Sequence, residues 1–127
     1  MQELIDGLKK QLSIYETLYK STIKEKEAFS NKDNDLFMSV LSERLKLMDE
    51  ISQLEGKLRP LREDWIERKD ALAEDFNEEV LSLVENIKGI MDKILEIENS
   101  VIESKMQQNK EVKSVPKRKA INSYKKI

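Results

Sequence analysis

Residues that are mostly apolar recur at alternating intervals of three and four along most of this chain, and this spacing constrains the fold more than any other feature. Such a period keeps one stripe on one face of a helix. The first stripe consists of Ile5, Leu8, Leu12, Tyr15, Tyr19, Thr22, Lys26 and Phe29. It predicts a helix over roughly residues 2–29.

A polar cluster at residues 30–35 interrupts the stripe with Ser, Asn and Asp, which favour turns and helix N-caps. We expect a tight hairpin loop there and a second helix from near Asp35. The second stripe consists of Phe37, Val40, Arg44, Leu47, Ile51, Leu54, Leu58, Leu61 and Trp65, with Arg44 off pattern. Pro60 falls inside it, and because the phase continues afterwards we expect a bend and not an end.

A third stripe follows one residue out of phase, through Phe76, Val80, Leu83, Ile87, Ile90, Ile94, Ile97 and Val101. The shift between residues 66 and 75 predicts a turn, with Asp70 or Asp75 as N-cap of a third helix. A continuous, locally overwound helix is the alternative. Short connections favour antiparallel neighbours. The predicted fold class is therefore all-α, an antiparallel three-helix coiled-coil-like bundle made of a long helical hairpin and a third helix.

Composition and charge divide the chain into two parts. Charged residues make up 38% and hydrophobic residues 39% of the 127, which favours a thin bundle over a thick spherical core. The stripe is lost after Met106, and Pro116 stops a helix from continuing. Residues 110–127 hold seven Lys or Arg against one acidic residue, whereas residues 1–109 hold 16 against 24. We predict a helical domain over 1–109 and a flexible basic tail over 110–127.

The residue types present argue against catalysis. The chain has no Cys and no His, which removes thiolate chemistry, the commonest general base and the usual transition-metal ligands. We interpret the carboxylate pairs Glu25/Glu27, Glu78/Glu79 and Glu96/Glu98 as solvated helix faces. No Gly-rich phosphate loop or nucleophile elbow occurs. We expect no enzyme activity, no catalytic residue, no cofactor and no metal site.

Two further patterns bear on location. No segment approaches the ~18 uninterrupted apolar residues of a membrane span, and the first residues lack a basic stretch followed by an apolar one. We expect a cytoplasmic protein without direct membrane insertion.

The predicted third helix carries more apolar residues than one stripe needs. The additional ones are Leu81, Val84, Met91, Leu95 and Ile102. So wide an apolar face favours two neighbours, namely the hairpin and a helix from either a client or a second copy. A three-helix core that uses the whole surface is the alternative. The candidate client-binding residues are Val84, Ile87, Met91, Ile94, Leu95, Val101 and Ile102.

The basic tail contains one aromatic residue, Tyr124, and no recognisable nucleic-acid reading module, so we expect no nucleic-acid partner. Two interpretations stay open, a solubilising tail and a docking peptide for a protein partner. In the second, Tyr124 is the anchor and Lys117, Arg118 and Lys119 are steering charges.

Several short segments resemble the helical hairpin of flagellar export chaperones of the FlgN type. They are Glu3-Leu4-Ile5, Leu12, Tyr15-Glu16, the run from Lys24 to Phe29, the loop with Asp33, the run from Leu45 to Ile51, Leu54-Glu55 and Arg59. Glu98-Asn99 with Val101-Ile102 resembles the asparagine-bearing stretch of the last helix in that family. The resemblance covers residues 3–106. Pro60 and the Lys-Lys-Ile ending depart from the family pattern.

The resemblance implies a cytoplasmic, non-catalytic chaperone of flagellar type III secretion. Its partners would be the hook-filament junction proteins, whose C-terminal amphipathic helix it binds, preventing premature assembly, and a membrane protein of the export gate, to which it delivers them. A tail tyrosine engages that gate protein in the family, and Tyr124 occupies the corresponding place. The alternative function is a coiled-coil scaffold that forms a homodimer or larger oligomer through its third helix.

Overall fold

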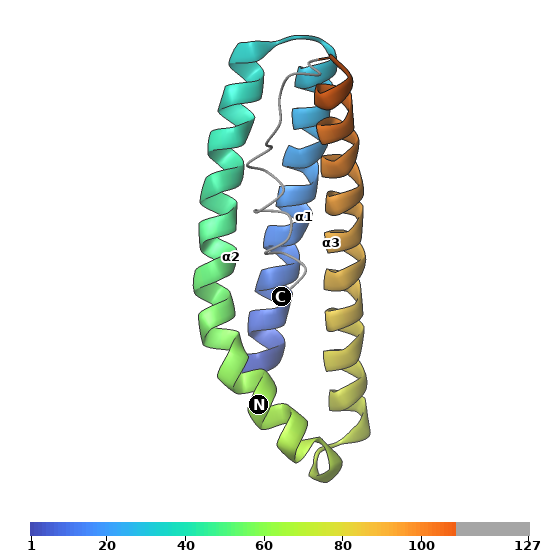
Figure 1. The fold of residues 1–127 in the computed structure, drawn as a ribbon. Coiled ribbons are helices and arrows are strands. Elements are labelled where there is room, and N and C mark those ends of the chain that lie inside the picture. Colours follow the sequence, from blue (N-terminus) through green and yellow to red (C-terminus); the bar gives the residue numbers. More distant parts are fainter. Residues whose placement is uncertain (109–127) are drawn as a thin grey trace.

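The computed structural model describes residues 1–108, which fold into three long helices joined by two short connections (Figure 1). Helix α1 spans Gln2–Ser30, α2 spans Asn34–Arg68 and α3 spans Glu74–Gln108. A single 3-10 turn, η1, covers Lys69–Ala71. No strand occurs within the described residues. The predicted all-α three-helix bundle is confirmed, and the predicted tail at 110–127 lies outside the described residues.

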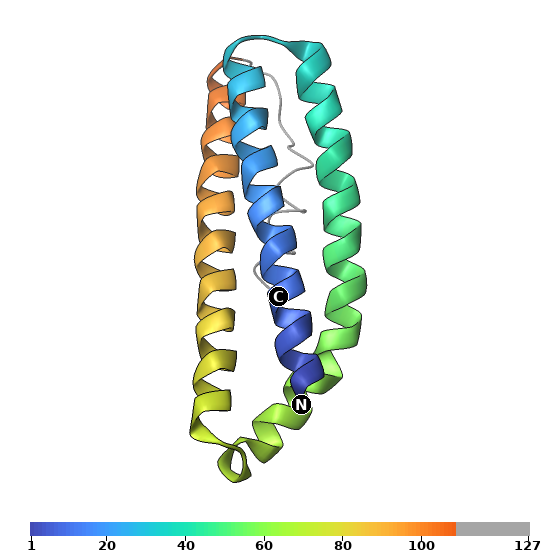
Figure 2. The same cartoon turned by 180° about the vertical axis from the view of Figure 1, so that it is seen from behind.

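Helix α1 is the shared partner of the other two helices. It packs along both α2 and α3, whereas α2 and α3 do not pack along each other within the described part of the chain. Figures 1 and 2 show α2 and α3 on either side of α1 in both views. Because two turns connect the three helices, α1 and α3 run in one direction and α2 in the other. The facing flanks of α2 and α3 therefore border the surface of α1 between them.

The turn between α1 and α2 is short and closed by backbone hydrogen bonds, as predicted. Asp33 N donates to Ala28 O at 2.9 Å and Lys32 N donates to Phe29 O at 3.2 Å, while Lys32 adopts a positive φ of 56°. This is the Schellman arrangement, in which a left-handed residue ends a helix. The Asp33 carboxylate then accepts from Leu36 N at 3.1 Å and so caps α2.

Helix α2 continues through Pro60 and bends in the light green segment of Figure 1. The proline ring is exposed, so the missing N–H interrupts the solvent side of the helix. The predicted turn before α3 is also confirmed, but the predicted N-caps are wrong. Ala73 O accepts the first helical bond, from Asn77 N at 3.1 Å, and Asp75 lies inside the first turn.

The Asn77 side chain, and not an aspartate cap, fastens this second turn. Trp65 Nε1 donates to Asn77 Oδ1 at 2.8 Å, and Asn77 Nδ2 donates to Lys69 O at 2.7 Å. These bonds tie the end of α2 to the start of α3.

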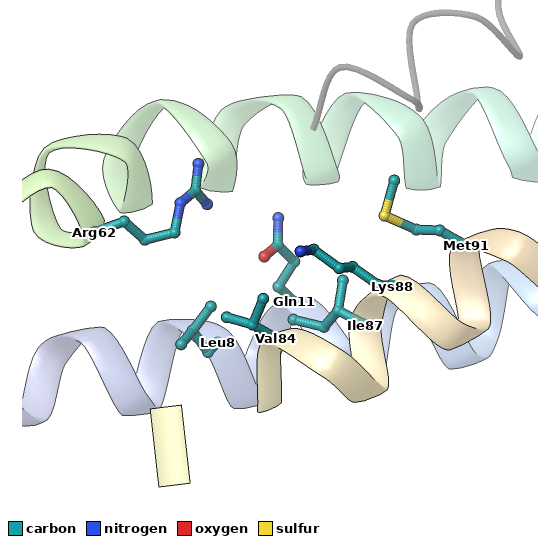
Figure 3. Close-up of a pocket in the computed structure, with 7 residues that line it drawn as sticks. All are labelled: Leu8, Gln11, Arg62, Val84, Ile87, Lys88 and Met91. Atoms are coloured by element: carbon teal, nitrogen blue, oxygen red, sulfur yellow. The ribbon is translucent and has the colours of Figure 1, made fainter. Parts of the chain in front are cut away.

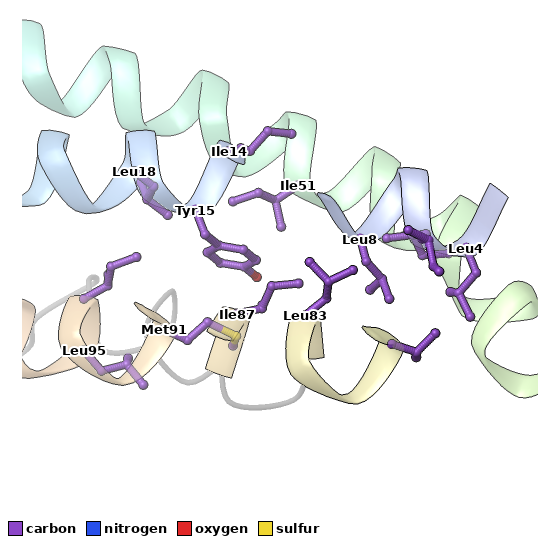
Figure 4. Close-up of a cluster of buried hydrophobic side chains, with 14 of the residues drawn as sticks. Leu4, Leu8, Ile14, Tyr15, Leu18, Ile51, Leu83, Ile87, Met91 and Leu95 are labelled. Atoms are coloured by element: carbon purple, nitrogen blue, oxygen red, sulfur yellow. The ribbon is translucent and has the colours of Figure 1, made fainter. Parts of the chain in front are cut away.

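The core is one apolar cluster with side chains from all three helices, part of which is drawn in Figure 4. Most residues of the predicted stripes are buried or half-buried in it. The first stripe is wrong near the end of α1, where Lys26 is exposed while Glu25 and Ala28 are buried. From Thr22 onward the buried positions are three residues apart, at Glu25 and Ala28, instead of alternating between three and four. This spacing places the carboxylate of Glu25 inside the bundle.

Candidate binding groove

The facing flanks of α2 and α3, with α1 between them, form the candidate site, which we call the α2/α3 groove. A hollow of about 60 Å³ lies in it and is lined by all three helices (Figure 3). Its lining residues are Leu8, Gln11, Arg62, Val84, Ile87, Lys88 and Met91. The wall is apolar except for one amide and two cationic side chains. Such a lining suits an apolar side chain flanked by acidic groups.

The structure divides the predicted client-binding residues into two sets. Ile87, Ile94 and Val101 recur every seven residues and are buried, and Ile87 also lines the hollow. Val84, Met91, Leu95 and Ile102 lie on the neighbouring flank, which faces α2. Val84 is half-buried at the hollow, whereas the other three are buried. Leu81, which is 51% exposed, extends this flank outward.

A buried cluster of three charged residues joins the helices near the α1–α2 turn. Arg44 Nη1 of α2 lies 2.6 Å from Glu25 Oε2 of α1 and 2.5 Å from Glu98 Oε1 of α3. The carboxylate side chains are 0% and 1% exposed. Burial raises the pKa of Glu98, and the opposing charges of Arg44 and Lys105 do not fully offset this effect. We call these residues the three-helix cluster.

The three-helix cluster corrects two sequence-based interpretations. Glu25 and Glu98 were expected on solvated faces, and both are buried. Arg44, which interrupts the second stripe, is buried because it neutralises those carboxylates. A charged residue at a stripe position was a usable signal, since it has to meet a countercharge from another helix.

A second polar cluster lies further along the groove. Arg62 forms a two-pronged ion pair with Glu55, about two turns earlier in α2, with one Nη1–Oε2 distance of 2.9 Å. Gln11 of α1 also donates to Glu55, at 3.2 Å. Burial alone would raise the pKa of Glu55, but the hydrogen bonds from Arg62 and Gln11 lower it below the ordinary value. The same pairing raises the pKa of Arg62.

A larger hollow, of about 320 Å³, lies where α1 and α3 end and α2 begins. It is lined by Phe29, Lys32, Asn34, Phe37 and Lys105, and we call it the end pocket. The two phenyl rings are 6.1 Å apart, and Lys105 Nζ lies 5.6 Å from the Phe29 centroid and 4.6 Å from the Phe37 centroid. These are cation–π distances. Partial burial lowers the pKa of Lys105, while the charge of Glu98 opposes that shift.

The remaining sequence predictions concern the tail residues, metal sites and membrane spans. Tyr124, Lys117, Arg118 and Lys119 lie outside the described residues. Within residues 1–108 no group of three or more His, Cys, Asp or Glu side chains is arranged to hold a metal ion. None of the three helices there combines the length and the apolar character needed to cross a bilayer.

Searches of protein-family models, curated proteins and solved structures returned no match for this chain.

Proposed function

We propose that this protein is a cytoplasmic chaperone that holds an amphipathic helix of another protein in the α2/α3 groove. The observation that carries the proposal is that α1 packs along both other helices, whereas α2 and α3 do not pack along each other within the described residues and approach each other through side chains such as Arg44 and Glu98. The arrangement corresponds to three positions of a four-helix bundle. A helix with one apolar face is the element that fits a fourth position.

Apolar residues on α2 support the proposal. Leu41, Leu45 and Met48 are spaced by four and three and lie on the flank of α2 that continues to Glu55 and Arg62. Leu45 is 66% exposed, and the other two are half-buried. On the opposite wall, Val84 is half-buried and Leu81 is half exposed. A fourth helix would cover side chains on both walls, which a single seam does not explain.

The family resemblance supplies the class of client. We assign the C-terminal amphipathic helix of the hook-filament junction proteins to the groove, so that the chaperone prevents their premature assembly. Delivery to the membrane protein of the flagellar type III export gate is assigned to the basic tail, with Tyr124 as anchor. Tyr124→Ala should then stop secretion of the client without changing client affinity or melting temperature.

The groove is tested with a synthetic peptide of the last thirty or so residues of a junction protein from the same organism. Leu45→Asp and Val84→Asp should each weaken binding about thirtyfold in calorimetry, because each leaves a charge facing an apolar surface. Leu36→Asp is the matched control, since Leu36 is 43% exposed on the other flank of α2. It should bind like the parent.

The scaffold alternative predicts a different outcome from the same variants. Unchanged peptide affinity in Leu45→Asp and Val84→Asp would place the client elsewhere. If sedimentation instead showed that these substitutions convert a dimer of the parent into a monomer, the groove would be a homo-oligomer interface. Both conclusions require that the variants melt within a few degrees of the parent, which shows that they are folded. Leu45 is largely exposed, so its substitution should change stability little.

A further inference from the structure

The end pocket differs chemically from the rest of the groove. Its five lining residues supply two aromatic rings, two ammonium groups and one amide, and none supplies a carboxylate. Phe37 stands one heptad before Arg44, so it lies on the flank of α2 that faces α3. Lys105 stands one heptad after Glu98, the α3 partner of Arg44. The pocket therefore closes the same groove at the end where the α1–α2 turn lies.

The opposite end of the molecule has the opposite charge. Residues 63–79, which include the turn between α2 and α3, carry eight acidic against two basic residues. A helix lying in the groove thus has a strongly acidic surface near one terminus and two lysines near the other. The N-terminus of a helix carries a partial positive charge and the C-terminus a partial negative charge. The charges at both ends therefore favour a bound helix whose N-terminus lies near residues 63–79 and whose C-terminus lies at the end pocket.

We infer that the end pocket receives the C-terminus of the helix held in the groove, with its terminal carboxylate between Lys32 and Lys105 and its last apolar side chain against Phe29 and Phe37. The bound helix runs parallel to α1 and α3 and antiparallel to α2. This inference rests on the proposed function and adds the polarity of the client and the chemical group that the chaperone recognises. The ligand is a helical peptide that ends in an apolar residue and a free carboxylate.

The position of Lys105 suits this role. Its ammonium group is held over two ring faces, so the aliphatic stem and the charge are both fixed before a ligand arrives. Lys32 has the left-handed backbone conformation of the turn, and its side chain is exposed at the rim. A carboxylate there meets two cations and the Asn34 amide. A charge partly removed from water interacts more strongly than one at an open surface.

The first test compares the thirty-residue junction-protein peptide as a free acid and as a C-terminal amide. With the parent protein, amidation should weaken binding roughly fivefold at low salt, the size expected of a partly exposed ion pair. Lys105→Gln and Lys32→Gln should bind the free-acid and the amidated peptide with nearly equal affinity. Lys93→Gln is the matched control, because Lys93 Nζ lies 6.0 Å from the Tyr19 ring and outside the pocket. In Lys93→Gln, amidation of the peptide should weaken binding as much as it does in the parent.

The second test measures orientation. The chain has no Cys, so Ser30→Cys and Asp70→Cys give single labelling sites at exposed positions near the two ends of the groove. A nitroxide on residue 30 should broaden NMR signals from the C-terminal residues of the isotope-labelled peptide, and a nitroxide on residue 70 those from the N-terminal residues. The reverse pattern, or an equal amidation loss in the parent and in Lys105→Gln, would overturn the inference while leaving the chaperone function standing. Failure of the parent to bind either peptide would overturn both.

Discussion

Two polar clusters interrupt the apolar interior, and they compensate the burial of carboxylates in different ways. The three-helix cluster places two carboxylates on one guanidinium nitrogen and is almost completely buried. The cluster of Gln11, Glu55 and Arg62 has one carboxylate, a two-pronged guanidinium and an amide, and its Arg62 side chain is 26% exposed. Glu98 consequently has a raised pKa and Glu55 a lowered one. The pKa of a buried carboxylate rises when desolvation outweighs the nearby positive charges, as at Glu98, and falls when several donors bond to it, as at Glu55.

The comparison makes Arg44 the residue whose loss costs most. Arg44→Met should lower the free energy of unfolding by about 3–5 kcal/mol, because it leaves the buried carboxylates of Glu25 and Glu98 without their guanidinium partner. Urea unfolding followed by circular dichroism measures the change. Arg68→Met is the control, since Arg68 forms only an exposed i,i+4 pair with Asp64. It should change stability by less than about 0.5 kcal/mol.

The second cluster should be less sensitive to the same change. Arg62→Met removes the two-pronged partner of Glu55, but this pair lies near the surface, where water can replace the lost donors. We predict a loss of about 1–2 kcal/mol in the same urea experiment. A loss as large as that of Arg44→Met would contradict the distinction between the two clusters.

The opposite pKa directions predict opposite pH dependences. Folding raises the pKa of Glu98 above 4.5, so its contribution to stability is full below that value and is lost as the pH rises through the folded pKa. Folding lowers the pKa of Glu55 from 4.5, so its contribution is present above that value and is lost as the pH falls. Urea titrations between pH 3 and 8 on Glu98→Gln and Glu55→Gln test both.

Relative to the parent, Glu98→Gln should therefore gain stability as the pH rises, whereas Glu55→Gln should lose it. Parallel curves for the two variants would show that the carboxylates have equivalent surroundings. Curves that diverge in the predicted directions would assign the different surroundings of the two clusters to Glu98 and Glu55.

The smallest effect concerns backbone packing beside the second cluster. A Cβ added to Gly7 would clash with Leu58 Cδ2, whereas a Cβ at Gly56 or Gly89 meets nothing within 4 Å. Gly56→Ala and Gly89→Ala should stabilise by about 0.5–1 kcal/mol through helix propensity. Gly7→Ala should be neutral to about 1 kcal/mol destabilising, because crowding of Leu58 offsets the same gain. Thermal melts of the three variants provide the check, and a stabilised Gly7→Ala would show that Leu58 moves freely.

Local signals in the sequence predict the secondary structure well. The three- and four-residue spacing, the Ser30–Asp35 cluster and the phase shift after Trp65 place all three helices and both turns. These features act over one or two helical turns, so a single sequence displays them. The start of α3 at Ala73 and Glu74 was missed, because the Asn77 side chain that fastens this turn bonds to Trp65 and Lys69, and these bonds depend on where α2 ends.

The candidate site was predicted only in part. The apolar excess on α3 is visible in the sequence, but periodicity does not say which of its residues α1 covers. Six of the seven predicted residues proved to be buried, and Val84 is half-buried. Val84, Ile87 and Met91 line the hollow. The end pocket combines residues from α1, the first turn, α2 and α3, and no short motif joins them.

Hydrophobic periodicity and turn chemistry are local properties, so they are enough to specify that this chain forms long amphipathic helices with tight turns. Three features became visible only in the folded molecule: α1 is the shared partner, α2 and α3 do not pack along each other, and Glu25, Arg44 and Glu98 meet inside the bundle. The physical reason is that desolvation and pairing of a charge depend on side chains up to 73 positions apart in the chain, such as Glu25 and Glu98. An isolated helix would leave each of these charges in water.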